Sequence, residues 1–227
     1  MDLYKKIAIL NKAYNIYDNF STGLDVACKK SCAHCCTRNV TLTTIEAYKI
    51  IDYMVLNKKL KLFKKVKAES DMERFHPEIT TNRLAMLCIK GEKIPVEKES
   101  GTLIKCPLLI DDECPVYPVR PFGCRCFVSK QPCSEIGYAD VDPFVLSVNN
   151  LFLQFIEHVD SDGYTGNLTD LLLSISFGEE GLHSEICIKK QKKNLLVHNM
   201  PITVLMIPPE HRQRIEPVVE ALKKIKV

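Results

Sequence analysis

The chain has 227 residues, a formal net charge of +3 and a hydrophobic share of 46%. This composition excludes a disordered or fibrous chain and favours one domain that buries a sizeable core. Its 31 basic and 28 acidic side chains are too evenly balanced to indicate a nucleic acid or a membrane surface as partner. No run of about 18 apolar residues predicts a spanning helix. Because the polar start is unlike a signal peptide, we expect a cytoplasmic protein.

The N-terminal part is predicted to be largely helical. Apolar residues at helical spacing predict an amphipathic helix over residues 3–20. A short strand-like stretch follows over residues 39–43. Thr43 and Glu46 have the spacing of a capping box, in which the hydroxyl and the carboxylate accept from free amides at a helix start. We therefore expect a second helix from there to about Leu56.

The middle of the chain is predicted to change from helix to irregular structure. The lysine-rich residues 57–67 are interpreted as the solvated face of a helix, with a basic partner-binding face as the alternative. A further helix is expected over residues 76–89, followed by a charged loop over 91–101. Residues 106–133 are rich in proline, which predicts a turned, irregular backbone.

The C-terminal part contains one strong helix-start signal, because Asp142 supplies an N-cap and Pro143 suits the first helical position. Residues 177–181 are interpreted as a loop. The elements expected are a helix to about His158, a short helix from Asn167 to Leu173, a strand-like run over 202–207 and a final helix from Pro208.

These elements show neither an internal repeat nor an alternation of strands and helices. We predict a mainly α-helical fold with little β structure around an irregular, loop-rich cysteine core. The predicted organisation is an N-terminal helix with a metal-binding domain over residues 1–136, and a helical extension over 137–227 that packs on it.

Eleven cysteines are the unusual feature of the composition. Without an export signal they would lie in a reducing compartment, where disulfides rarely persist, and their odd number argues against complete pairing. Nine of them form two groups. The first, spaced C-x3-C-x2-C-C, is Cys28, Cys32, Cys35 and Cys36, and the second is Cys106, Cys114, Cys124, Cys126 and Cys133.

Dense groups of thiols point to a soft metal. Short loops between ligands cost little closure entropy, so one group converges on a metal and the other completes its shell. Thiolates favour zinc or an iron–sulfur cluster, whereas magnesium and calcium prefer carboxylates. Ordinary buried thiols would be scattered along apolar faces without this spacing.

The adjacent Cys35 and Cys36 bear on the number of metals. In extended backbone their side chains point to opposite sides, whereas on a helix the four cysteines of the first group share one broad face. Either two neighbouring metals are bound or a polynuclear cluster spans both thiolates. We expect at least two metal atoms.

The two groups and their surroundings resemble a known family. The first runs Cys28-x3-Cys32-Ala33-His34-Cys35-Cys36, followed by Thr41-Leu42-Thr43 and Glu46. The second runs Lys105-Cys106-Pro107-Leu108-Leu109, then Glu113-Cys114-Pro115-Val116-Tyr117-Pro118-Val119-Arg120-Pro121-Phe122-Gly123-Cys124-Arg125. Together they are similar to the motifs of the CxxCxxCC family of zinc- or iron-chelating proteins, the YkgJ-type cysteine-cluster proteins. The resemblance covers about half the chain, which departs from the pattern in having three residues between its first two cysteines.

The resemblance implies a set of metal ligands. At the position of Cys126 the family resembled has a polar residue, Cys88 matches an optional family cysteine, and Cys187 matches no family position. These three cysteines are therefore weaker ligand candidates, and so is His34. Arg120 and Arg125 flank Cys124 and are expected to offset the negative charge of a thiolate-bound cofactor or to orient an anionic substrate. The implied ligands are Cys28, Cys32, Cys35, Cys36, Cys106, Cys114, Cys124 and Cys133.

Two classes of function follow. The first is an iron–sulfur protein, with a 4Fe-4S cluster, in redox or group-transfer chemistry, because the family resembles the metal module of flagellin lysine N-methylases. The second is a structural zinc module that organises the proline-rich region for a protein partner, with metal storage or delivery as a third role.

Other enzyme classes have little support in the sequence. A radical-SAM enzyme would share the three-cysteine spacing, but its repeated βα units are missing and Cys36 would be unexplained. No glycine-rich phosphate-binding loop and no outstanding Cys–His pair indicate nucleotide binding or hydrolysis.

Overall fold

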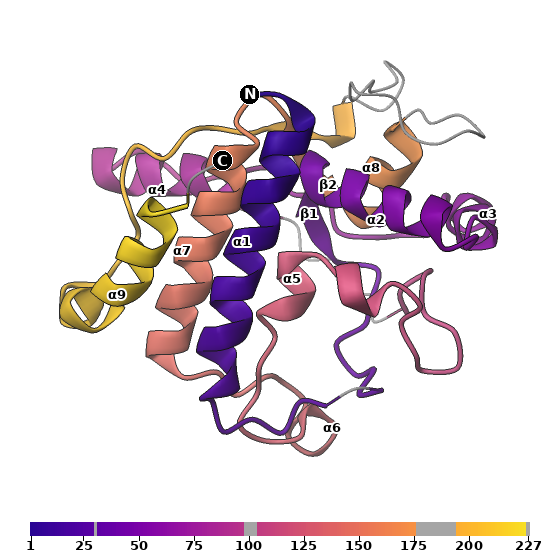
Figure 1. Ribbon diagram of the computed structural model, residues 1–227, viewed down its shortest axis with the longest axis horizontal. Helices are drawn as coiled ribbons and strands as arrows, with labels where there is room; N and C mark the ends of the chain where they lie inside the picture. The colour runs from indigo at the N-terminus through magenta and orange to yellow at the C-terminus, as the bar shows by residue number, and fades with distance from the viewer. Residues whose placement is uncertain (30, 98–103, 176–193, 226–227) are drawn as a thin grey trace.

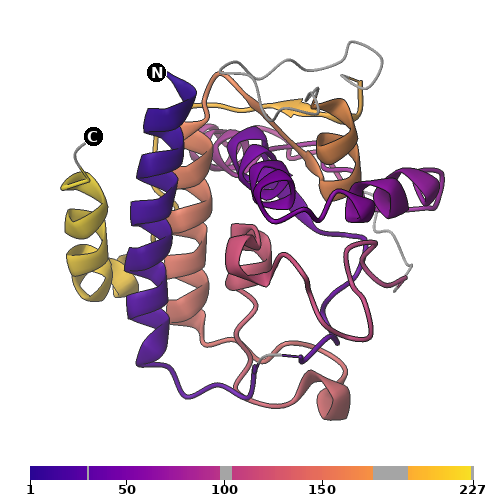
Figure 2. The same ribbon diagram turned by 45° about the vertical axis from the view of Figure 1, so that its right-hand side comes forward.

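Two long helices lie side by side through the middle of the molecule. They are α1 (Leu3–Thr22) and α7 (Pro143–Val159), and α9 (Arg212–Lys223) packs against both (Figures 1 and 2). The computed structural model describes residues 1–29, 31–97, 104–175 and 194–225. Apolar side chains between these three helices form the first hydrophobic core, which includes Leu10, Tyr17, Phe122, Phe152 and Ile215.

A second hydrophobic core lies beside the first. It is built from α2 (Thr44–Leu56), α3 (Lys61–Ala68) and α8 (Leu168–Ser174), with Ile50, Met54 and Leu171 fully buried. The shorter helices are α4 (Thr81–Lys90), α5 (Phe122–Arg125) and α6 (Cys133–Ile136), with 3-10 turns η1 (Tyr117–Val119) and η3 (Pro209–His211).

A small antiparallel sheet joins distant parts of the chain. Its order is β1-β2-β3, from β1 (Thr41–Thr43), β2 (Tyr164–Asn167) and β3 (Val197–His198). Leu42 pairs with Gly166, and Thr165 pairs with Val197. Elements from both sides of residue 136 therefore share one sheet, and both cores likewise combine helices from the two parts.

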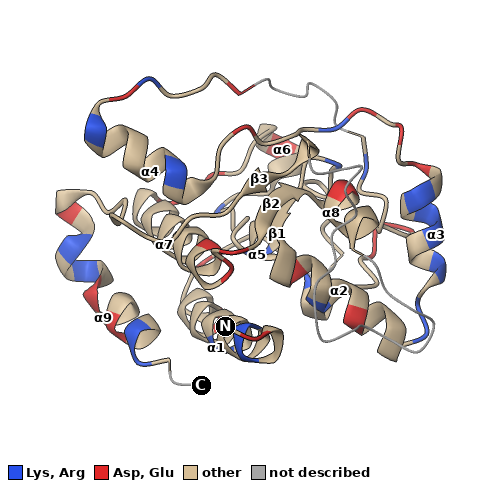
Figure 3. Ribbon diagram, turned by 90° about the horizontal axis from the view of Figure 1, so that it is seen from above, with Lys and Arg blue, Asp and Glu red and all other residues tan. Residues whose placement is uncertain are grey.

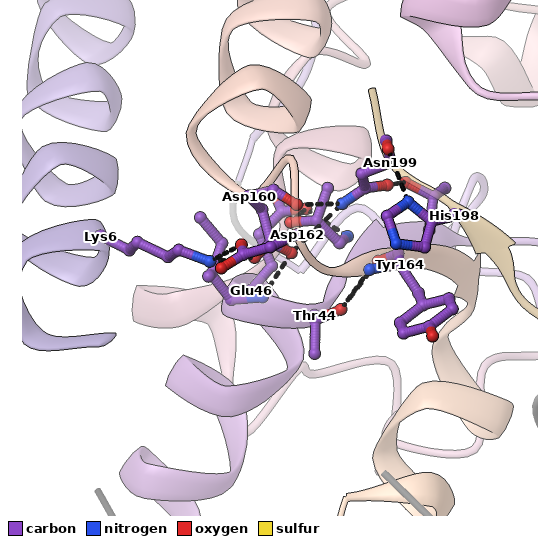
Figure 4. Close-up of polar contacts among 11 residues, drawn as sticks. Lys6, Thr44, Glu46, Asp160, Asp162, Tyr164, His198 and Asn199 are labelled. Atoms are coloured by element: carbon purple, nitrogen blue, oxygen red, sulfur yellow. Dashed lines mark hydrogen bonds and ion pairs between the residues drawn. The ribbon is translucent and has the colours of Figure 1, made fainter. Parts of the chain in front are cut away.

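A buried carboxylate joins the ends of three elements (Figure 4). Asp160, directly after α7, accepts from the Ile45 N–H of α2 (3.2 Å) and from Lys6 Nζ of α1 (3.3 Å). The Asn199 side chain after β3 donates to its main-chain oxygen (2.9 Å), while Lys6 also pairs with Asp162. This network fixes the start of α2 relative to α1 and α7.

The mainly α-helical fold is confirmed, and so are its strongest local signals. Glu46 and Thr43 form the capping box at the start of α2. Asp142 accepts from the Phe144 N–H (2.9 Å) at the start of α7, and Asn167 accepts from the Thr169 N–H (3.0 Å) at the start of α8. Each helix start follows from hydrogen bonds between residues two or three apart.

Two local predictions are wrong. The helix expected from residue 76 begins at Thr81, because Pro77 disfavours helix before it and Thr80 provides the cap. Residues 202–207 form no strand, since Gln154 of α7 bonds the Val204 carbonyl and the Met206 N–H (both 2.8 Å). The sequence left open whether the cysteines of residues 28–36 lie in extended backbone or on a helix, and the structure places them in turns and coil. The loop predicted over residues 177–181 and part of the one over 91–101 lie outside the described residues.

Candidate metal centre

Two irregular segments meet at one end of the molecule. The chain that leaves α1 runs beside the segment that contains α5 and α6 (Figures 1 and 2). Main-chain hydrogen bonds tie them together, from Ala27 N–H to the Ser129 carbonyl (2.8 Å) and from Cys106 N–H to the Cys36 carbonyl (2.9 Å). The two cysteine groups, far apart in sequence, therefore lie next to each other.

The segments enclose a cavity of about 500 Å³. Arg120, Arg125 and His34 also line it, and apolar side chains including Val40 and Leu108 form much of the wall. All eight implied ligands line this one cavity: Cys28, Cys32, Cys35, Cys36, Cys106, Cys114, Cys124 and Cys133.

A second cavity, of about 690 Å³, lies against the same cysteine loop. Cys32, Cys35, Cys36 and Cys133 line it as well, together with the exposed side chains of His34, Phe127 and Tyr138. Three cysteines of the first group, together with Cys133, therefore border both cavities.

The thiols line cavity walls and do not form a core of their own. In residues 1–29, 31–97, 104–175 and 194–225, no three His, Cys, Asp or Glu side chains gather as they would around a metal ion. The predicted cysteine core is thus not confirmed, and both hydrophobic cores consist of apolar side chains. The donor types still suit a soft metal, because eight thiols line the same cavity and sulfur is the ligand that such metals prefer.

The surroundings of five of the cavity thiols favour their protonated form. Burial raises the pKa of the Cys28, Cys114 and Cys124 thiols, and raises that of Cys106 to about 11. A hydrogen bond with Cys36, followed by burial, raises the pKa of Cys35. A metal would have to displace these protons, so binding would be favoured at higher pH.

Four basic side chains act on the second cysteine group, and sequence reasoning had connected only Arg120 of them with the site. Burial dominates the pKa of Cys106 and Cys114, but Arg38 and Lys65 lower the pKa of Cys106, while Arg120 and Lys59 lower that of Cys114.

Two lysines of the basic run also hold the loop that carries these cysteines. Lys65 Nζ donates to the Leu109 carbonyl and Lys59 Nζ to the Pro115 carbonyl, both at 2.8 Å. Figure 3 shows the basic residues along α3. The run over residues 57–67 is therefore more than a solvated face. Its composition was visible in the sequence, but its partners were not.

The two predicted arginines have different surroundings. The buried Arg125 donates from Nη1 to both carboxylate oxygens of Asp18 (2.9 and 3.0 Å), and from Nη2 to the Pro118 carbonyl (3.0 Å). Arg120 stacks on the Tyr117 ring (3.9 Å to the centroid) and donates to the Tyr117 carbonyl (3.1 Å). Arg125 thus holds the loop in place, whereas Arg120 is the less constrained cation at the cavity wall.

Two of the weaker cysteine candidates, Cys126 and Cys88, lie apart from the cavities, whereas His34 lines both. Cys126 packs against the first hydrophobic core and its Sγ approaches the Gly123 carbonyl (3.5 Å). Cys88 is exposed on α4. Neither lines the two cavities described above. Cys187 lies outside the described residues.

The chain matches no protein-family model, no curated protein and no solved structure. The resemblance to the cysteine-cluster family therefore rests on the quoted motifs. Among the described helices, none is both long and apolar enough to cross a membrane.

Proposed function

We propose that this chain binds a metal cofactor through its eight cavity thiols, and that the cofactor is an iron–sulfur cluster used in redox or group-transfer chemistry. The observation that supports this proposal is the single cavity lined by both cysteine groups. Thiolates at this density suit soft metals, and the donor set contains more sulfurs than the four ligands of one cluster or one zinc ion.

The size of the cavity favours chemistry on a substrate. Its volume of about 500 Å³ lies within the range of small-molecule sites, about 300–1,000 Å³. When bound, a cluster would supply electron transfer or an iron atom with an open position. The thiols would hold it, and Arg120 would offset its negative charge or orient an anionic substrate.

A structural zinc module is the second candidate function. The segments that carry the thiols contain only the short α5, α6 and η1, so they have few regular hydrogen bonds of their own. Structural zinc contributes about 10–16 kcal/mol in small peptides, enough to order such a region. Phe127 and Tyr138, 50% and 66% exposed beside the second cavity, would then contact a protein partner. Metal storage or delivery would use the same thiols.

Anaerobic purification followed by analysis for iron, zinc and acid-labile sulfide, with an absorption spectrum, tests the proposal. Brown protein with equal iron and sulfide supports the cluster, whereas colourless protein with about two zinc ions per chain supports the structural module.

Variants locate the site within the chain. Cys32→Ala and Cys124→Ala should lower metal content and thermal stability together, while Cys88→Ser and Cys187→Ala should change neither. Full metal content in Cys124→Ala would contradict a site built from both cysteine groups.

A further inference from the structure

The positive charge of the chain is concentrated in one short segment. Residues 57–67 contain six lysines and no acidic side chain. Because the whole chain has a net charge of +3, all its other residues together have a net charge of −3. An ordinary exposed helix alternates opposite charges that compensate each other. This segment has no such compensation of its own.

Four of the six lysines form an exposed surface on α3 and on the turn that precedes it. Leu62 and Val66 of α3, 2% and 0% exposed, pack in the second hydrophobic core. Because the helix turns by about 100° per residue, its exposed lysines lie on the side opposite to these two residues. Figure 3 shows α3 with its basic residues at the edge of the molecule. We name the exposed set the basic face: Lys58, Lys61, Lys64 and Lys67.

No carboxylate of the described chain compensates the basic face. Its four lysines form no ion pair within residues 1–29, 31–97, 104–175 and 194–225. Glu69, the first acidic residue after α3, is paired with Arg38 instead. Asp71 and Glu73 are exposed beyond the end of the helix, and neither pairs with the basic face. Four cationic side chains are therefore available to a partner.

The surroundings of the basic face favour a protein over a nucleic acid or a membrane as that partner. Every cation in it is a lysine, whereas bidentate contacts to phosphate need the guanidinium group of arginine. Because the apolar side of α3 is buried, the helix cannot insert it into a lipid surface. Leu56, the last residue of α2, is 73% exposed and lies two residues before Lys58. An apolar contact with a charged rim is typical of protein interfaces.

The same segment is connected with the candidate metal centre. Lys59 Nζ donates to the Pro115 carbonyl and Lys65 Nζ to the Leu109 carbonyl, both at 2.8 Å. These carbonyls belong to the loop that carries the second cysteine group. A partner on the basic face therefore contacts the helix that holds this loop.

We propose that the basic face is the docking surface for an acidic protein. Asp and Glu side chains of the partner pair with its four lysines, and an apolar side chain of the partner covers Leu56. Exposed charges at an interface mainly accelerate encounter, so this complex forms fast, is weak and is sensitive to salt. The proposal uses no thiol and no metal, and it therefore stands independently of the proposed function.

A labelled acidic peptide is the probe that tests the basic face. Fluorescence anisotropy measures how a fluorescein-labelled peptide of glutamates and leucines binds the full chain, from low to physiological ionic strength. Lys61→Gln/Lys64→Gln/Lys67→Gln should weaken binding about tenfold at low ionic strength, since each exposed ion pair is worth a factor of about two. The salt dependence of binding should decrease as well. Because these side chains are exposed, the far-UV circular dichroism spectrum should stay unchanged.

A matched variant removes the same charge elsewhere. Lys5, Lys90 and Lys93 are exposed outside the basic segment, and Lys5→Gln/Lys90→Gln/Lys93→Gln should bind the peptide as the parent chain does. Leu56→Ser should weaken binding at every ionic strength and leave the salt dependence unchanged, because it removes an apolar contact and no charge.

An equal loss in the two triple variants, or no binding of the peptide by the parent chain at low ionic strength, would refute the proposal. A DNA duplex or phosphatidylserine vesicles that bind the parent more tightly than the peptide, and lose binding in the α3 variant, would overturn the choice of a protein partner. Iron and zinc analysis of the same samples is a separate readout. A chain purified without metal that still binds the peptide through the basic face would refute the proposed function alone.

Discussion

We expect substitution of Glu46 to destabilise the helices that hold the cysteine cavity more than substitution of any other single carboxylate. Its Oε1 accepts from the Tyr14 hydroxyl and from the Phe122 N–H, both at 2.7 Å. Its Oε2 accepts from the Thr43 N–H (2.8 Å) and from the Thr43 hydroxyl (2.9 Å). Glu46 thus joins α1 and α2 to the start of α5, which carries Cys124 into the cavity.

Glu46→Gln replaces one of these oxygens by an NH₂ group. Either orientation of the amide places that group against a main-chain N–H, from Phe122 or from Thr43, which cannot turn round to accept. One hydrogen bond to a charged group is worth about 1.5–3 kcal/mol, and a buried donor without a partner costs about 1–3 kcal/mol. We therefore expect the free energy of unfolding to fall by about 3 kcal/mol.

Urea unfolding of the parent and variant chains measures the change in the free energy of unfolding, and thermal melts measure the change in Tm. For a chain of this length, a loss of about 3 kcal/mol corresponds to a decrease in Tm of about 6–12 °C. Asp52→Asn is the matched control, because Asp52 lies half-buried on the same helix and burial raises its carboxyl pKa. A loss below about 1 kcal/mol for Glu46→Gln, or an equal loss for Asp52→Asn, would refute the reasoning.

Three further predictions concern buried groups elsewhere. Burial raises the pKa of Asp160 to about 7, so the folded state keeps a proton that the unfolded chain releases. The stability of the parent chain should therefore fall as pH rises from about 4 to 7. Asp160→Asn should flatten that pH dependence, as measured by thermal melts at several pH values. Gly163→Ala places a methyl group against the Asp160 carboxylate, well inside van der Waals contact, and should cost about 1–3 kcal/mol, whereas Gly23→Ala, whose nearest contact is 3.8 Å, should not destabilise; equal chemical denaturation curves would contradict this. Arg125→Lys loses the fork of donors that reaches the Asp18 carboxylate and the Pro118 and Arg120 carbonyls together, and should lower stability by about 2–4 kcal/mol, against less than about 1 kcal/mol for Arg120→Lys in the same assay.

The long helices could be predicted from the sequence because their signals are local. The capping box of Thr43 and Glu46 and the Asp142–Pro143 pair act within one turn of their helices. The strands β2 and β3 could not be predicted, because each is short and is stabilised by pairing with a distant segment. Residues 202–207 show the reverse case, since an apolar run there is held by the side chain of Gln154 instead of a neighbouring strand.

The two cysteine groups could be found from residue type and spacing, and the family resemblance implied eight ligand candidates among them. The structure places all eight around one cavity. Their surroundings could not be predicted. Lys59 and Lys65 bond loop carbonyls that lie far along the chain, and Arg125 pairs with Asp18 of α1.

The proposal of a soft metal comes from the sequence by itself, because sulfur donors at this density favour such metals whatever the fold. The sequence also determined the helices whose caps and periodicity are local. Only the tertiary structure decided which thiols are neighbours, where Cys133 lies and which cations face the second group. Those relations depend on the packing of segments separated by most of the chain, and no short-range pattern encodes which distant surfaces will bury each other.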